Sequence, residues 1–174
     1  MRVPIAFQGE HGAFSEQAIK KFGEYHELGK HGIELEAVPR PNFDDLFAGI
    51  EEVGLGIVPV FNSTAGLVAE NLKLILENRV LIVSEHYLRV RHCLLGVEGA
   101  IPQKGDKVYS HPQALKQCRN YLKGRELESV EAKDTAGAAR WLSELKGEER
   151  LRNFAIAGKA VAEIYGLGIL EEGI

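Results

Sequence analysis

The sequence predicts an α/β fold of two lobes, with mostly parallel sheets around a cleft. Short apolar runs alternate with amphipathic segments along the whole chain, which is typical of parallel strands covered by helices. An extended run over residues 80–97 has the pattern of a chain that crosses from one lobe to the other. Polar residues follow four of the predicted strands, at the sheet edge where open α/β proteins bind ligands.

We expect lobe 1 to contain residues 1–79 together with residues 159–174, and lobe 2 to contain residues 80–158. The second boundary follows from a return of the chain near residues 158–166. Clefts between lobes are favoured places for small ligands. The polar strand ends of both lobes are therefore expected to face the cleft.

Three strand–helix units make up the predicted first lobe. The apolar run 3–8 predicts a buried strand, followed by a glycine-containing turn into a helix. Residues 33–38 predict a second strand, after which Asn42 caps a helix. The apolar run 55–60 predicts a third strand covered on both faces, and residues 67–76 predict the helix after it.

The second lobe repeats the strand–helix pattern. Residues 108–109 end an apolar run that leads into a predicted helix over residues 113–121. The run 127–132 leads into a helix whose cap is either Asp134 or Thr135. The remaining predicted elements are a strand over residues 154–157, a helix over residues 159–165 and a closing strand over residues 167–170.

The stretch 108–118 is the most informative part of the sequence. Pro112 suits the first position of a helix, where a missing N–H is not needed, so that Ser110 or His111 is left to cap the helix start. Such a helix start favours an anion. Gln117 lies roughly two turns further along, either close to the same face as Ser110 or one turn away from it. The plainer interpretation is an ordinary strand-to-helix junction with a good cap.

Similar polar residues follow other predicted strands, where they fit either a ligand site or plain turns and caps. They are Gly12 and Ser15 after the first strand, Asn62, Ser63 and Thr64 after the third, and Thr135 and Ala136 in the second lobe. The turn that contains Gly12 lacks the Lys-Ser/Thr ending of a P-loop and the third glycine of a dinucleotide-binding motif.

Composition and charge limit the partners that we expect. The net charge of −4 gives no reason to expect a nucleic acid or an anionic membrane, but it permits an anionic small substrate. The two cysteines, Cys93 and Cys118, are expected to be reduced and buried. No paired His/Cys spacing indicates a metal. Because no signal peptide and no apolar run of the ~18 residues needed for a membrane span is present, we expect a cytoplasmic, soluble protein.

Five motifs in this order resemble the prephenate dehydratase family and together cover essentially the whole chain. They are Gly9-x-x-Gly12-x-Phe14-Ser15, Val58-Pro59-x-x-Asn62-Ser63, Ser110-His111-Pro112-Gln113-Ala114-Leu115-x-Gln117-Cys118, Asp134-Thr135-Ala136 and Tyr165-Gly166-Leu167. The Ser-His-Pro-Gln stretch is the most specific of them.

The resemblance implies a fold similar to type II periplasmic binding proteins. It also implies decarboxylation and dehydration of prephenate, a dianionic small molecule, to phenylpyruvate in phenylalanine biosynthesis, without a cofactor or metal. By the same resemblance, the catalytic residues are Asn62, Ser110 and Gln117, and the substrate-binding residues are Gly12, Ser15, Ser63, Thr64, His111, Thr135 and Ala136.

The chain departs from the family pattern in two places. Phe61 stands where the family usually has a glutamate, and the sequence ends at Ile174, before the Thr-Arg-Phe motif and the regulatory ACT domain that many members carry. Three alternatives stay open on these grounds. They are an arogenate dehydratase or a prephenate decarboxylase that does not form an aromatic ring, a non-catalytic small-anion binding protein, and a catalytic-domain fragment that needs the missing C-terminal part.

The sequence leaves the oligomeric state open. Family members commonly associate. Val161 and Ile164, on the predicted helix over residues 159–165, fit either a homodimer contact or the core.

Overall fold

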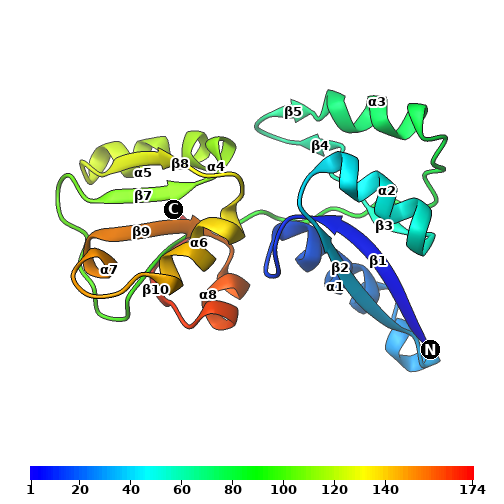
Figure 1. The fold of residues 1–174 in the computed structure, drawn as a ribbon, viewed down its shortest axis with the longest axis horizontal. Helices are drawn as coiled ribbons and strands as arrows, with labels where there is room; N and C mark the ends of the chain where they lie inside the picture. Colours follow the sequence, from blue (N-terminus) through cyan, green and yellow to red (C-terminus); the bar gives the residue numbers. More distant parts are fainter. The chain divides into compact units, whose positions relative to one another are not determined.

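The computed structural model describes residues 1–174, which divide into two compact units (Figure 1). Unit 1 comprises residues 1–10 and 14–89, and unit 2 comprises residues 11–13 and 90–174. Strands and helices alternate in both units. Two strand pairs in unit 1 and two strand pairs in unit 2 are parallel. The predicted α/β class is confirmed.

The expected lobe boundaries differ from this division. The sequence predicts residues 159–174 in lobe 1, but they belong to unit 2 because β10 (Gly168–Glu172) pairs antiparallel with β6 (Cys93–Gly96). The other boundary lies at residue 90 rather than 80. Within the predicted extended run, only β6 forms a strand, and residues 80–92 form neither helix nor strand.

Unit 1 is built on a parallel sheet with the strand order β2-β1-β3. Its strands are β1 (Arg2–Gln8), β2 (Glu34–Arg40) and β3 (Gly56–Ile57), and a short antiparallel hairpin follows, made of β4 (Phe61–Asn62) and β5 (Gly66–Leu67). Its helices are α1 (Phe14–Tyr25), the 3-10 helix η1 (Leu28–His31), α2 (Phe43–Val53) and α3 (Ala69–Glu77).

The third predicted strand is much shorter than expected. The sequence predicts it over residues 55–60 with both faces covered, but only Gly56–Ile57 pair, and Leu55 is 41% exposed. Two features account for the difference. β3 lies at the edge of its sheet, and Pro59 has no N–H to continue the ladder.

The predicted cap of α2 is confirmed. The Asn42 side chain accepts a hydrogen bond from the Asp45 backbone N–H at 2.8 Å, and the helix ends at Gly54 with φ of 88°. One face of α2 packs against β1, β3 and α3. The core of the unit consists of Ala6, Leu46, Phe47, Ile50 and Ile75.

Unit 2 contains a five-stranded mixed sheet with the order β10-β6-β9-β7-β8, in which β7 lies between β9 and β8 (Figure 1). The strands not yet given are β7 (Lys107–Ser110), β8 (Glu128–Glu131) and β9 (Asn153–Ala157). The helices are α4 (Pro112–Gln117), α5 (Arg119–Gly124), α6 (Thr135–Glu144), α7 (Glu149–Arg152) and α8 (Lys159–Tyr165). The helix expected over residues 113–121 is therefore two short helices that meet at Cys118.

Both cysteines are buried in unit 2 and unpaired with each other. Burial raises the pKa of the Cys118 thiol to about 11 and also raises that of Cys93. On α8, Val161 is fully buried and belongs to the core, whereas Ile164 is about half exposed. No helix of the chain is both long enough and apolar enough to cross a membrane.

Candidate active site

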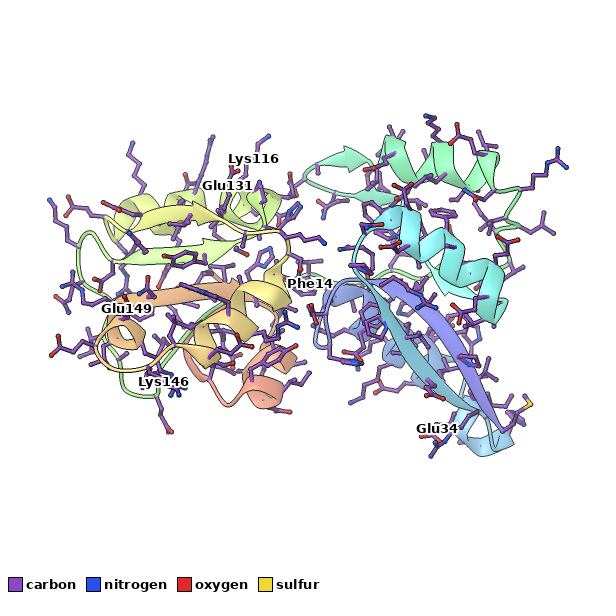
Figure 2. The ribbon with its side chains drawn as sticks, in the orientation of Figure 1. Phe14, Glu34, Lys116, Glu131, Lys146 and Glu149 are labelled. Carbon is purple, nitrogen blue, oxygen red and sulfur yellow. The ribbon has the colours of Figure 1, made fainter.

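Several predicted site residues of unit 2 lie at one edge of its sheet. Strands β7, β8 and β9 run parallel, so their carboxyl ends meet at the same side. Ser110 is the last residue of β7, His111 follows it, and Thr135 begins the helix after β8. Near this edge, the side chains of Lys116 on α4 and Glu131 at the end of β8 project from the same side of the unit (Figure 2).

Ser110 lies inside the sheet rather than on its surface. Its side chain is fully buried, and its hydroxyl donates a hydrogen bond to the Ile156 carbonyl oxygen at 2.6 Å. This bond joins β7 to the neighbouring strand β9. In this arrangement the hydroxyl proton of Ser110 is used in a hydrogen bond within the protein.

His111 is the residue that caps α4. Its Nδ1 accepts a hydrogen bond from the Gln113 backbone N–H at 3.1 Å, and Pro112 occupies the first helical position, as predicted. Of the two caps that the sequence left open, the structure therefore selects His111 over Ser110. Because Nδ1 accepts, the ring proton of neutral His111 lies on Nε2.

Gln117 is held by a histidine that sequence reasoning did not connect with it. The Nε2 of His92 lies 2.7 Å from the Oε1 of Gln117. His92 is only 7% exposed, and burial lowers its pKa. The two residues are 25 positions apart, so no local pattern could have indicated the pair.

Asp134 caps α6, which settles the choice between Asp134 and Thr135. Its Oδ1 accepts a hydrogen bond from the Gly137 backbone N–H at 2.7 Å. Thr135 is the first residue of the helix and is partly exposed, whereas Ala136 is fully buried. Ala136 therefore packs inside unit 2, and Thr135 is the residue of this pair that can meet a ligand.

The Asn62 side chain closes the hairpin between β4 and β5. Its Oδ1 accepts hydrogen bonds from the Thr64 backbone N–H at 2.9 Å, from the Thr64 hydroxyl at 2.6 Å and from the Ala65 backbone N–H at 3.1 Å. Ser63 and Thr64 are exposed at the turn. Phe61 is 59% exposed and pairs across the hairpin with Leu67, so the residue that replaces the family glutamate lies on the surface of unit 1.

Gly12 and Ser15 belong to different units. Gly12 has φ of +88°, and a Cβ atom at this position would lie 2.9 Å from the Val161 side chain in unit 2. Next to it, the Tyr165 hydroxyl donates a hydrogen bond to the His11 carbonyl oxygen at 3.1 Å. Close packing against α8 thus accounts for the glycine. Ser15 is partly exposed in the first turn of α1 in unit 1.

The predicted site residues therefore form two sets. Unit 2 brings Ser110, His111 and Thr135 to one sheet edge and adds Gln117 on α4, whereas unit 1 contributes the Asn62 hairpin and Ser15. Amides and hydroxyls dominate both sets, which suits hydrogen bonding to an anionic ligand. No group of three or more His, Cys, Asp or Glu residues is arranged to hold a metal ion.

Comparison with known proteins gives a family match over nearly the whole chain. The family model described as "Prephenate dehydratase" matches residues 5–174. The chain is 40% identical to "Arogenate dehydratase/prephenate dehydratase 1, chloroplastic" of Arabidopsis thaliana, over 99% of this chain and 42% of that protein. It is 38% identical to "Prephenate dehydratase" of Methanocaldococcus jannaschii, over 94% of this chain and 56% of that protein. The chain thus spans about half the length of the relatives that it matches.

Solved structures give the same fold. One described as "GqqA- a novel type of quorum quenching acylases" superimposes with a TM-score of 0.80 at 31% identity, over 98% of this chain and 59% of that chain. A prephenate dehydratase from Arthrobacter aurescens, in complex with L-Phe, gives a TM-score of 0.78 at 22% identity, over 99% of this chain and 55% of that one. At 22% identity the second likeness shows the fold alone.

Proposed function

Because the chain belongs to the prephenate dehydratase family, we propose that it is a carbon–oxygen lyase that converts prephenate to phenylpyruvate in L-phenylalanine biosynthesis. The observation that carries the proposal is the family match over residues 5–174. The Ser110-His111-Pro112-Gln113 motif supports it, since it lies at the carboxyl ends of the parallel strands β7, β8 and β9, where α/β proteins favour ligands.

The reaction places modest demands on the protein. The bond between the ring and its carboxylate breaks, carbon dioxide leaves, and the released electron pair enters the ring. The bond between the ring and its hydroxyl then breaks, and the oxygen leaves as water after taking a proton. Because the product ring is aromatic, the driving force lies in the substrate. The protein needs to orient the dianion and to donate a hydrogen bond to the departing oxygen.

Amide and hydroxyl donors of this chain suit those tasks. We assign the Gln117 amide and the Thr135 hydroxyl, from unit 2, and the Asn62 amide, from unit 1, to substrate contacts. The Gly137 N–H at the start of α6 donates to the Asp134 side chain, so only the N–H groups that precede it in the helix add donors beside Thr135. His111 lies at the same edge with its Nδ1 engaged by the Gln113 N–H, which supports a role in holding the helix start.

Arogenate is the second candidate substrate. The relatives from Arabidopsis thaliana and Petunia hybrida are named arogenate dehydratases or arogenate/prephenate dehydratases. Arogenate carries an amino group where prephenate carries a keto group, and the ring chemistry is the same. Its product would be phenylalanine instead of phenylpyruvate.

Product analysis tests the proposal. The purified chain is incubated with prephenate and, separately, with arogenate, and phenylpyruvate and phenylalanine are quantified against a blank without protein. We expect phenylpyruvate from prephenate, at a rate that Gln117→Leu lowers and the surface variant Ser129→Ala leaves unchanged. Phenylalanine from arogenate alone would reverse the substrate assignment. Carbon dioxide without an aromatic product would identify a decarboxylase. Saturable binding of prephenate without any product would identify a binding protein.

A further inference from the structure

The contact between His92 and Gln117 joins two parts of unit 2 that are remote in the sequence. His92 precedes β6, and Gln117 ends α4. The His92 Nε2 and the Gln117 Oε1 lie 2.7 Å apart, and the histidine is 7% exposed. A hydrogen bond of this length restricts both side chains, because breaking it would leave the buried His92 ring nitrogen away from water.

The chemistry of the two groups defines the direction of the bond. An amide oxygen only accepts, so the ring proton of His92 lies on Nε2 and is donated to Gln117. The amide nitrogen of Gln117 then points away from the imidazole and presents its two N–H donors elsewhere. Burial lowers the pKa of His92, which keeps the ring neutral at neutral pH and keeps the bond a neutral one.

The backbone of His92 is also held in place. Its carbonyl oxygen accepts hydrogen bonds from the backbone N–H groups of Gly173 at 2.9 Å and Ile174 at 3.2 Å, just beyond β10. On the other side of the contact, Cys118 follows Gln117 and is buried in the same core as Leu94 and Leu115. Both ends of the hydrogen bond are thus anchored to the packed interior of the unit.

We infer that His92 is a positioning residue: its Nε2–H orients the Gln117 side-chain amide so that the amide N–H groups face the substrate. The inference rests on the proposed function, in which Gln117 donates to the anionic substrate. His92 itself touches neither the substrate nor the reacting atoms. Its contribution is to remove the rotational freedom of a donor before the substrate arrives.

Side-chain NMR tests the positioning without reference to turnover. The ¹⁵N relaxation of the Gln117 amide is compared in the native chain, His92→Leu, His92→Gln and His92→Asn. We expect an ordered amide in the native chain and a mobile one in His92→Leu. His92→Gln, whose amide N–H can reach the position of the imidazole Nε2–H, should restore order, and the shorter His92→Asn should not. An equally ordered Gln117 amide in folded His92→Leu would overturn the inference.

Kinetics with the same variants tests the consequence for the reaction. We expect His92→Leu to lower kcat on the order of 10²-fold, with a smaller change in KM, and His92→Gln to recover most of the loss. The double variant His92→Leu/Gln117→Leu should be no slower than Gln117→Leu alone, because the two residues act through one amide. Additive losses would overturn the inference. If the native chain turns over neither prephenate nor arogenate, the proposed function fails, and the NMR comparison still decides the role of His92.

Discussion

The Ser110 hydroxyl donates a hydrogen bond to the Ile156 carbonyl oxygen at 2.6 Å inside unit 2. The resemblance of its motif predicts a catalytic role for Ser110, and its side chain is fully buried in the structure. The bond holds the end of β7 against β9, directly before the residue that caps α4. Ser110 thus links the packing of the sheet to the geometry of the edge at which the candidate site residues His111 and Thr135 lie.

Ser110→Ala should lower both stability and turnover. Loss of one buried hydrogen bond costs about 1 kcal/mol of the free energy of unfolding, and the loosened strand end displaces the neighbouring residues of the site. Urea unfolding and turnover of prephenate measure the two effects, with the exposed Ser129→Ala on β8 as the control. We expect turnover to fall by on the order of 10²-fold after correction for the folded fraction. Normal turnover would exclude Ser110 from the mechanism.

The two halves of the Asn62 amide can be tested separately. Asn62→Asp keeps an oxygen that can accept from Thr64 and Ala65, so the hairpin should persist, but it removes the amide N–H. Asn62→Ala removes both. If the N–H contacts substrate, both variants lose turnover by about 10²–10³-fold while their circular dichroism and melting temperature remain close to native. Full activity in Asn62→Asp would restrict Asn62 to a structural role in the turn.

Gly12→Ala should destabilise the chain. The added Cβ would lie 2.9 Å from the Val161 side chain, at a φ of +88° that L-residues rarely adopt. Overpacking of this kind costs about 1–3 kcal/mol, which thermal unfolding would show as a lowered Tm. The matched control is Gly29→Ala, where nothing lies within 4 Å of the added atom. Equal melting temperatures for the two variants would contradict the close packing of this turn on α8.

The stability of the chain should fall at alkaline pH. Burial raises the pKa of Cys118 from 9.0 to about 11, so between these values the unfolded thiol loses its proton and the folded one keeps it. The contribution is complete below pH 9.0 and is lost as pH rises through about 11. Urea unfolding from pH 7 to 11 measures this slope, and Cys118→Ala should reduce it. An unchanged slope would show that Cys118 does not cause the loss.

Local sequence patterns determined the kind and order of the elements. The alternation of apolar runs and amphipathic segments predicts β1, β2, α2, β7, β9 and α8 closely. The cap at Asn42 and the proline at the start of α4 also follow from residue type and spacing. Each of these features depends on neighbours a few residues away, so a short stretch of sequence contains all the information.

Tertiary structure decided what depends on residues that are far apart in the chain. The pairing of β10 with β6 places residues 159–174 in unit 2, whereas the sequence predicts them in lobe 1. The pairing of β7 with β9 brings the Ser110 hydroxyl to Ile156, 46 positions away, and the fold of unit 2 brings His92 to Gln117. The residue types and motifs of the sequence predict which polar groups belong to the candidate site. Their partners follow from which buried atoms meet once the sheet has formed, because a buried donor must find an acceptor in the fold itself.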